Sequence, residues 1–159
     1  MDRVTLREVR EDDLSVFHAH EQDPAAAWRA AFTSPTRGEL VAYLDFWHTK
    51  VLADPSNVSR TVLVDERPAG YVLKFPMFGK PSVAYWLGRE FWGRGVATRA
   101  LRAFLNEVHE RPLAARVAAD NHASLRVLEK CGFNVIDRER GFANARDAEI
   151  DELVLELRT

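Results

Sequence analysis

The sequence predicts an α+β fold, a mixed sheet of about seven strands flanked by helices. Strand-like segments follow one another around the middle of the chain, and the second half then reads helix, strand, helix, strand, strand. A chain of 159 residues with 47% hydrophobic residues fits one domain and can build a sizeable core. We therefore expect a single domain that covers residues 1–159.

The first fifty residues predict one strand and three helices. Residues 4–9 alternate apolar and polar side chains as a half-buried strand does, and residues 11–13 supply acids to the start of a helix. That helix is expected to run to about residue 21, and Pro24 is suited to open a second, short helix. A third helix follows, for which Thr33 or Thr36 is the expected N-cap. Its apolar residues recur at helical spacing: Leu40, Val41, Leu44, Trp47, Val51 and Leu52.

The rest of the chain predicts six strands and two helices. Residues 61–64 and 69–73 flank a polar turn and read as a hairpin. Gly132 is expected to end the second of the two helices. The elements after the hairpin are a strand over residues 82–87, a helix over 95–109, a strand over 113–118, a helix over 123–130, and closing strands near 135–138 and 149–157.

Composition and charge exclude several classes of protein. The formal net charge of -2 gives no overall basic field, so we expect no nucleic-acid partner. Cys131 is the single cysteine, which excludes an intrachain disulfide framework and a cysteine-cluster metal site and fits a reducing cytoplasm. The first residues lack an apolar signal core, and no apolar run approaches the roughly 18 residues of a membrane span. These features predict a cytoplasmic protein that binds neither membrane nor metal.

A glycine-bearing turn between residues 85 and 101 is the most informative local feature. An apolar strand, Tyr-Trp-Leu, leads through Gly93 and Gly95 directly into a helix, so the backbone can pass close to a ligand. The unpaired N–H groups and the positive dipole end of that helix suit an anion, here a pyrophosphate. A P-loop is excluded because no Gly-Lys-Ser or Gly-Lys-Thr follows, and a Rossmann fingerprint because Thr98 stands in the third glycine position. The alternative is a plain tight turn without a ligand.

Two motifs together resemble the GNAT acyltransferase superfamily. The turn reads Glu90-x-x-Gly93-x-Gly95, where the superfamily has Gln/Arg-x-x-Gly-x-Gly/Ala. Residues 121–133 resemble the Asn-x-x-Ser-x-x-x-x-Glu-Lys-x-Gly-Phe segment that follows the cofactor loop in these enzymes. The resemblance is strongest over residues 83–133 and lies near the branch of ribosomal-protein N-terminal acetyltransferases (RimJ/RimL-like). It implies the GNAT fold, acetyl-CoA as cosubstrate and N-acetyltransferase activity.

The resemblance also implies roles for individual residues. The main-chain N–H groups of residues 92–97 would hold the pyrophosphate, and main-chain groups at Leu87 would pair with the pantetheine arm. Asn121 would bridge that arm through its amide, and Ser124 would protonate the departing thiolate. For Asn121 and Ser124, a helix cap or a first-turn position is the alternative. The implied cofactor-binding residues are Leu87, Trp92, Gly93, Arg94, Gly95, Val96, Ala97, Asn121 and Ser124.

The general base is not assigned by the motifs. Close relatives sometimes carry a glutamate just upstream of the Tyr-Trp-Leu strand, but this chain has Ser82 there. Many superfamily members also place a tyrosine further along as general acid, where this chain has Val127 and Leu128. Candidate bases lie in the helical segment that lines the acceptor site in the superfamily: His18, His20, Glu21, Asp23 and His48. We predict His20, in the densest titratable cluster, as the base, because an imidazole with a pKa near 6.5 can accept a proton from an amine. A solvated helix end is the alternative.

The sequence therefore predicts a transfer of acetyl from acetyl-CoA to a primary amine by direct attack on the thioester. The acceptor is a small molecule or a peptide N-terminus, and the protein is a monomer or a homodimer. The alternative is a CoA-binding sensor or interaction domain of the same fold that has lost turnover.

Overall fold

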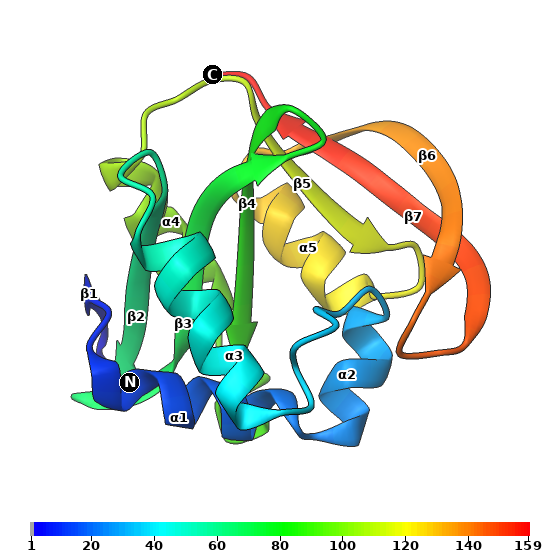
Figure 1. The fold of residues 1–159 in the computed structure, drawn as a ribbon. Helices are drawn as coiled ribbons and strands as arrows, with labels where there is room; N and C mark the ends of the chain where they lie inside the picture. Colours follow the sequence, from blue (N-terminus) through cyan, green and yellow to red (C-terminus); the bar gives the residue numbers. More distant parts are fainter. Residues whose placement is uncertain (1) are drawn as a thin grey trace.

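The computed structural model describes residues 2–159 and is built on one seven-stranded mixed sheet (Figure 1). The strands are β1 (Val4–Glu8), β2 (Val58–Val64), β3 (Arg67–Met77), β4 (Lys80–Leu87), β5 (Leu113–Ala118), β6 (Asn134–Ala143) and β7 (Ala148–Leu157). Their order in the sheet is β1-β2-β3-β4-β5-β7-β6, and β4 with β5 is the parallel pair while the other neighbours are antiparallel. The predicted α+β fold class is confirmed.

Helices cover both faces of this sheet. They are α1 (Glu11–Glu21), α2 (Pro24–Ala30), α3 (Leu40–Phe46), α4 (Val96–Glu107) and α5 (His122–Lys130), with a π-helical segment (Trp47–Leu52) after α3 and a 3₁₀ turn (Arg89–Phe91) before α4. The main core lies between the sheet and α4 with α5, and includes Val72, Phe104 and Leu128. A second core, which includes Phe17 and Trp47, packs α1, α3 and the π-helical segment against the opposite face at Leu73. In residues 2–159 no helix is long and apolar enough to cross a membrane.

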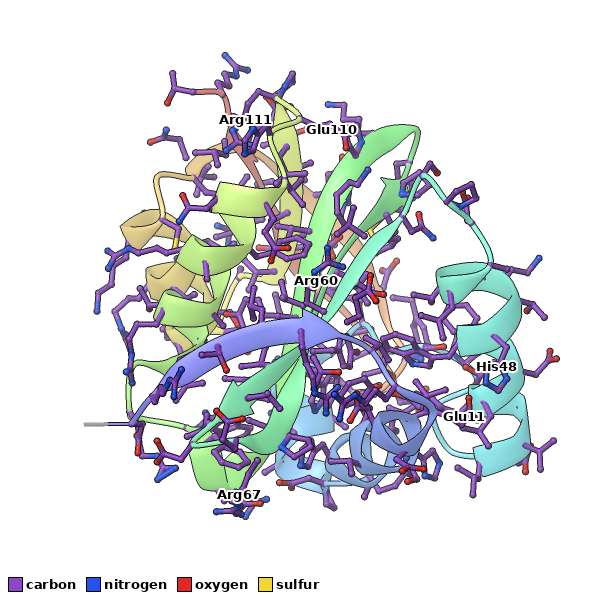
Figure 2. The ribbon with its side chains drawn as sticks, turned by 90° about the vertical axis from the view of Figure 1, so that its left-hand side faces the viewer. Glu11, His48, Arg60, Arg67, Glu110 and Arg111 are labelled. Carbon is purple, nitrogen blue, oxygen red and sulfur yellow. The ribbon has the colours of Figure 1, made fainter. Side chains whose placement is uncertain are left out.

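The third helix begins and ends differently from the sequence prediction. Its N-cap is Glu39, whose carboxylate accepts hydrogen bonds from the N–H groups of Val41 and Ala42, so the predicted caps Thr33 and Thr36 are wrong. The α-helix ends at Phe46 and the π-helical segment continues it. The exposed sides of α1 and the π-helical segment are joined by a 2.7 Å contact between Glu11 Oε2 and His48 Nε2 (Figure 2).

The parallel strands β4 and β5 separate along their length. β4 pairs with β3 from Met77↔Lys80 to Gly70↔Leu87, but its pairing with β5 is confined to Ser82↔Ala114. Main-chain groups of β4 after that position have no β5 partner along the strand edge. A gap of this kind between two parallel strands leaves backbone donors and acceptors free for a ligand, because backbone polar groups need partners.

Candidate active site

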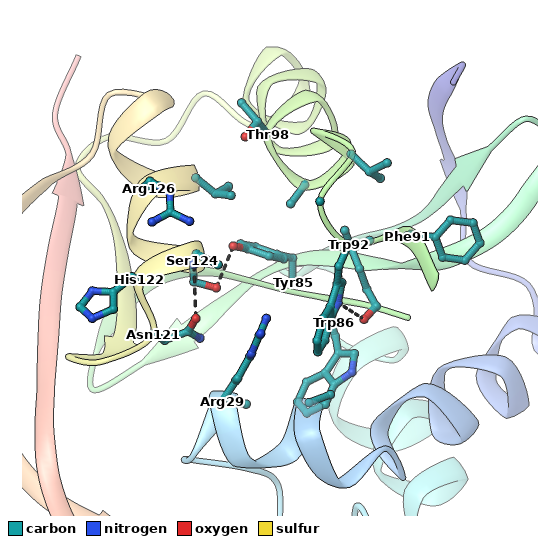
Figure 3. A pocket seen from close by; sticks show the side chains of 18 of the residues that line it. Arg29, Tyr85, Trp86, Phe91, Trp92, Thr98, Asn121, His122, Ser124 and Arg126 are labelled. Carbon is teal, nitrogen blue, oxygen red and sulfur yellow. Dashed lines mark hydrogen bonds between the residues drawn. The ribbon is translucent and has the colours of Figure 1, made fainter. Parts of the chain in front are cut away.

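A cavity of about 930 Å³ opens where β4 and β5 separate. It is lined by the end of β4, the glycine turn, the start of α4, the start of α5 and one side of α2 (Figure 3). The predicted cofactor-binding residues that line it are Leu87, Trp92, Gly93, Gly95, Val96, Ala97, Asn121 and Ser124. The fold therefore brings together residues that lie up to 37 positions apart in the sequence, from Leu87 to Ser124.

The glycine turn has the geometry of an anion cradle. Gly93 and Gly95 have φ angles of 73° and 71°, in the left-handed region that favours glycine. A Cβ at Gly93 would meet no atom within 4 Å. Glycine therefore suits this position because of its positive φ and not because of a close contact, and there is open space beside the turn. Gly95 is the N-cap of α4 and no side chain caps this helix. The first N–H groups of α4 are thus left for a ligand, and the residues present fit a pyrophosphate.

Two arginines at the turn, Arg94 and Arg99, lie outside the cavity lining, and Arg99 binds the backbone of the turn. The Arg99 guanidinium donates to three main-chain carbonyls, at 2.9 Å to Arg94, 3.3 Å to Gly95 and 2.5 Å to Asp2. The Arg94 side chain lies 3.4 Å from an Asp2 carboxylate oxygen and is not among the lining groups. Arg94 is the predicted cofactor-binding residue that does not line the cavity, and its role in cofactor binding stays a prediction.

Leu87 and Trp92 join the end of β4 to the turn. Leu87 is buried in the main core, and its carbonyl accepts a 3.1 Å hydrogen bond from the Trp92 indole N–H. This bond fixes the start of the turn against the strand end where β4 has left β5. The main-chain position predicted to face a pantetheine arm is held in place by a side chain five residues later.

Ser124 and Tyr85 form the polar centre of the cavity. The Tyr85 hydroxyl donates a 2.9 Å hydrogen bond to Ser124 Oγ (Figure 3). Burial raises the pKa of Tyr85 to about 12, partly offset by this bond, so the phenol stays protonated and is the donor at neutral pH. Asn121 is the N-cap of α5, because its Oδ1 accepts a 3.3 Å hydrogen bond from the Ser124 N–H. Ser124 is therefore in the first turn of α5, with its hydroxyl aimed at Tyr85 rather than capping the helix.

The charged side chains along the cavity are mostly cationic. Arg126 and Lys130, four residues apart on α5, line the cavity, and Figure 3 shows Arg126 on the side of Thr98 of α4. Arg146 also lines the cavity, but it binds both oxygens of Asp120, at 2.5 and 2.8 Å. These contacts lower the pKa of Asp120, the one lining carboxylate among residues 2–159, and keep it ionised.

Three of the five candidate bases are held by contacts outside the cavity. Glu21 is 3% exposed and accepts hydrogen bonds from Tyr43 at 2.5 Å and Tyr71 at 3.2 Å; burial raises its pKa. Asp23 caps α2 and is bound by the Arg89 guanidinium. His48 faces Glu11 as described above. None of these three side chains lines the cavity.

The two remaining candidates, His18 and His20, also lie outside the lining residues. His18 packs edge-on against Tyr43, with ring centroids 5.1 Å apart. The His20 ring lies against Gly88, where a Cβ would come within 2.6 Å of Nε2. Burial lowers the pKa of His20, although the charge of Glu90 opposes the shift. The structure does not bring His20 and Ser124 into one set of cavity residues, and the predicted role of His20 as the base stays a prediction.

The sequence interpretation missed Tyr85 and Arg29 as cavity residues. A strand alternates its side chains between two faces, so Tyr85 shares a face with Leu87, which was predicted at the site. That periodicity is the signal that could have identified Tyr85. Arg29 belongs to α2, and its guanidinium stacks 4.6 Å from the ring centre of Trp92. No local pattern indicates that contact, because it joins segments 63 residues apart.

Solved structures with the same fold include several acetyltransferases. The microcin C7 self immunity acetyltransferase MccE, in complex with acetyl-CoA and AMP, has a TM-score of 0.79 at 15% identity and covers 100% of this chain and 94% of its own. RimJ of Mycobacterium smegmatis, in complex with CoA-disulfide, has a TM-score of 0.78 at 19% identity, and the match covers 98% of this chain and 82% of the RimJ chain. Spermidine N-acetyltransferase of Vibrio cholerae, in complex with CoA and spermine, has a TM-score of 0.76 at 17% identity, and the match covers 97% of this chain and 95% of the acetyltransferase chain. These similarities confirm the predicted GNAT fold.

The sequence itself carries the family assignment. No curated protein sequence matches the chain. The family model described as the acetyltransferase (GNAT) domain matches residues 3–134, which is most of the chain and includes the glycine turn and the Asn-x-x-Ser segment. The chain therefore belongs to the GNAT family of acetyl-CoA-dependent N-acetyltransferases.

Proposed function

We propose that this protein transfers an acetyl group from acetyl-CoA to a primary amine of a small molecule or a peptide N-terminus. The observation that carries the proposal is the Tyr85–Ser124 hydrogen bond inside the cavity that the uncapped glycine turn also lines. One end of the cavity can hold an anion, and its centre holds a hydroxyl that can serve a leaving group. A domain that only binds CoA needs the first feature and not the second.

The residues that would hold acetyl-CoA divide into backbone and side-chain groups. The first N–H groups of α4, at Val96 and Ala97, would bind the pyrophosphate together with the turn. Arg126 and Lys130 line the same part of the cavity and would meet the phosphates through charge. The edge of β4 near Leu87, unpaired with β5, would bind the arm.

Acetyl-CoA, once bound, supplies the acetyl group as a thioester that an amine attacks directly. Ser124 accepts a hydrogen bond from Tyr85, so the hydroxyl hydrogen of Ser124 is free to be donated elsewhere. We assign that hydrogen to the departing sulfur. Tyr85 can in turn pass its proton to Ser124 Oγ and regain a proton from the solvent. The solvent takes up the proton that the amine loses, so that proton balances the one that the sulfur gains.

The amine must arrive in its neutral form. The lining side chains of residues 2–159 include one carboxylate, Asp120, and one imidazole, His122. Asp120 is bound by Arg146 through both oxygens, and the His122 ring points away from the Tyr85–Ser124 pair (Figure 3). Water, or the predicted base His20 through water, would carry the amine proton away.

The experiment is acetyl transfer with a panel of primary amines, measured as thiol release, for the wild type and Ser124→Ala. We expect turnover in the wild type and a decrease of roughly a hundred- to ten-thousand-fold in kcat for Ser124→Ala, with unchanged acetyl-CoA affinity. Ser124→Cys should recover part of the rate, because the cysteine side chain is similar in size to serine and again carries a hydrogen that can be donated. Equal rates for wild type and Ser124→Ala would return Ser124 to a purely structural position. Acetyl-CoA binding without turnover on any amine would favour the sensor domain.

A further inference from the structure

Three cationic side chains of the cavity lining form no ion pair within residues 2–159: Arg126 and Lys130 on α5, and Arg29 on α2. Arg29 is exposed on the last turn of α2, and its guanidinium stacks on the Trp92 ring at 4.6 Å from the ring centre. Within residues 2–159 it forms no ion pair, whereas Arg146 on the same side of the cavity is held by Asp120. Stacking on an indole fixes the plane of a guanidinium and leaves its N–H edge free to bind.

The position of Arg29 separates it from the groups that would meet the cofactor phosphates. The start of α4, Arg126 and Thr98 lie on one side of the Tyr85–Ser124 pair in Figure 3, and Arg29 rises from α2 on the other side, where it reaches the ring of Trp92. The hydroxyl pair marks the place where the sulfur would leave. A group that lies beyond this pair, away from the phosphate cradle, faces the acceptor rather than the cofactor.

The charges around Arg29 disfavour a polycationic acceptor. A second ammonium group on the acceptor would need a free carboxylate, and the one lining carboxylate among the described residues, Asp120, already binds Arg146 through both oxygens. An unpaired guanidinium in the acceptor space would in addition repel such a group. A planar carboxylate is the partner that the fork of an arginine fits with two parallel hydrogen bonds.

Resting on the proposed acetyl transfer, we infer that the acceptor is a small primary amine that also carries a carboxylate, and that Arg29 binds this carboxylate. The site then selects amino-acid-like amines over polyamines and over amines without an acidic group. Arg29 binds a part of the acceptor that does not react, so it stabilises the bound acceptor and the transition state equally. Substitution of Arg29 should therefore raise KM more than it lowers kcat.

The test compares matched acceptors that differ only in the acidic group. The rates of acetyl transfer are measured for the common L-amino acids that are primary amines with an uncharged side chain, for the corresponding L-amino acid amides, and for spermidine. The proteins compared are wild type, Arg29→Gln, Arg29→Lys and Arg3→Gln. Arg3→Gln removes the same charge at an exposed position, 3.9 Å from Glu66, and serves as the charge control. We expect the wild type to prefer at least one acid over its amide by at least about tenfold in kcat/KM, the range of a charge-assisted hydrogen bond. Arg29→Gln should bring that ratio close to one, Arg29→Lys should recover part of it, and Arg3→Gln should leave it unchanged.

Each other outcome overturns the inference or the function on which it rests. Preference for amides or spermidine, or a preference for acids that survives in Arg29→Gln, overturns the role of Arg29. Turnover confined to other amines overturns the carboxylate-bearing acceptor. A failure of the proposed function looks different, because the protein then turns over no amine of any kind. Calorimetry on the same samples shows whether it still binds acetyl-CoA, as a sensor domain would, or does not bind it.

Discussion

The cofactor segment, residues 80–130, and the N-terminal helical segment, residues 11–52, are both rich in polar groups, and they use them in opposite ways. In the cofactor segment the start of α4 has no capping side chain, and β4 leaves β5 with its edge unpaired. In the N-terminal helical segment the buried carboxylates find partners inside the fold, as Glu21 does with Tyr43 and Tyr71. Arg29, which lines the cavity, is a charged side chain of this segment that forms no ion pair within residues 2–159. The comparison teaches that a site is marked by polar groups that the fold leaves free, and not by the density of titratable residues.

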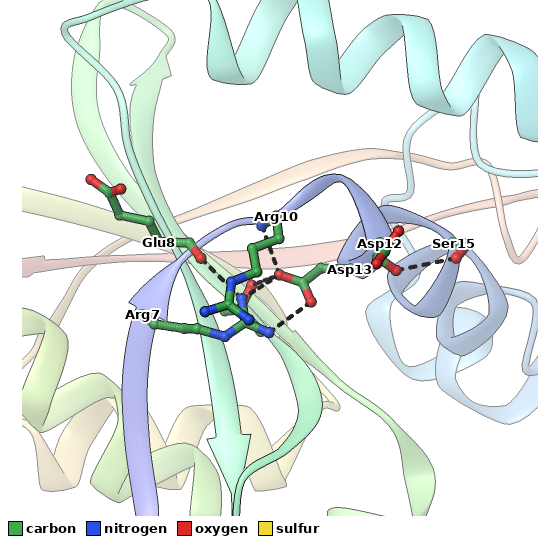
Figure 4. A network of polar contacts seen from close by, with 7 residues as sticks. Arg7, Glu8, Arg10, Asp12, Asp13 and Ser15 are labelled. Atoms are coloured by element: carbon green, nitrogen blue, oxygen red, sulfur yellow. Dashed lines mark hydrogen bonds and ion pairs between the residues drawn. The ribbon is translucent and has the colours of Figure 1, made fainter.

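Asp13 shows how a buried carboxylate of the N-terminal helical segment is paired with hydrogen-bond donors. Its carboxylate is 2% exposed and accepts hydrogen bonds from Arg7 at 2.6 and 2.9 Å, Thr61 at 2.6 Å and the Arg10 N–H at 2.8 Å (Figure 4). Burial alone would raise the pKa of Asp13, but the bonds from Arg7, Thr61 and Arg10 outweigh it and lower the pKa. This network ties β1, α1 and β2 together and engages both oxygens of the Asp13 carboxylate.

The largest effect is expected from Gly95→Glu in the cofactor segment. The substitution places a carboxylate at the predicted anion cradle and strains a φ of 71°, so acetyl-CoA binding should be lost while the protein stays folded. Gly79→Glu is the matched control, because Gly79 has a φ of 75° and open space around it but lies in the β3–β4 turn, outside the cavity lining. Calorimetric titration of both variants checks the prediction. If Gly95→Glu still binds acetyl-CoA tightly, the glycine turn is not the pyrophosphate-binding site.

The next effect concerns stability, in the N-terminal helical segment. Asp13→Asn leaves the Arg7 guanidinium without its carboxylate and should lower the free energy of unfolding by about 3 kcal/mol, with turnover per folded molecule retained. Asp12→Asn removes a carboxylate from the same helix turn; its exposed side chain is the control and should change stability little. Chemical denaturation of the two variants measures the difference.

The same pair of variants has a defined pH dependence. Because the pKa of Asp13 is lower in the folded state, its contribution is fully present above the unfolded value of about 3.9 and is lost as the pH falls through the folded value. The stability gap between wild type and Asp13→Asn should therefore narrow only below about pH 4. A gap that closes near neutral pH would show that a different group is responsible.

A smaller effect is expected at the hydroxyl pair. Tyr85→Phe removes the donor to Ser124 and should lower kcat by about tenfold, since Ser124 keeps its own hydrogen but loses its orientation. Tyr71→Phe removes a phenol hydroxyl that bonds Glu21 outside the cavity, and it should affect stability rather than kcat. Equal kcat values for Tyr85→Phe and wild type would remove Tyr85 from the mechanism.

The smallest effects should come from the histidines of the N-terminal helical segment. His48→Gln breaks an exposed contact with Glu11 and should change stability by less than about 1 kcal/mol. His20 is not among the residues that line the cavity, so we expect His20→Gln to change kcat by less than about tenfold, whereas the loss of a general base would cost roughly a hundredfold or more. A loss of the larger size, with a pH profile that loses its break near neutral pH, would instead establish His20 as the base.

Much of the fold was predictable because its signals are local. The strand over residues 113–118 matches β5, since a short apolar run between turns specifies it. β6 was predicted too short, at 135–138, because its charged residues show no apolar alternation. Its length comes from antiparallel pairing with β7 along both strands and from ion pairs of Arg138 and Arg140 with Asp151. Such pairing is a tertiary property that the segment alone does not encode.

The candidate site divides in the same way. The glycine turn depends on backbone conformation, which Gly93 and Gly95 specify locally, so its place was predictable. The Tyr85–Ser124 bond and the stacking of Arg29 on Trp92 depend on how β4, α5 and α2 pack, across separations of 39 and 63 residues. The motif predicted the cofactor-binding turn, and the tertiary structure was needed to find the groups that we propose to act on the leaving sulfur and on the acceptor.

The most direct test of the account is calorimetric titration of the wild-type protein with acetyl-CoA, with ATP and NAD titrated under the same conditions. The open glycine turn, the uncapped α4 and the separated strands predict micromolar binding that is confined to CoA compounds. Binding of ATP or NAD with equal affinity, or no binding of acetyl-CoA, would contradict it, because the turn would then be a structural connection or a general phosphate site.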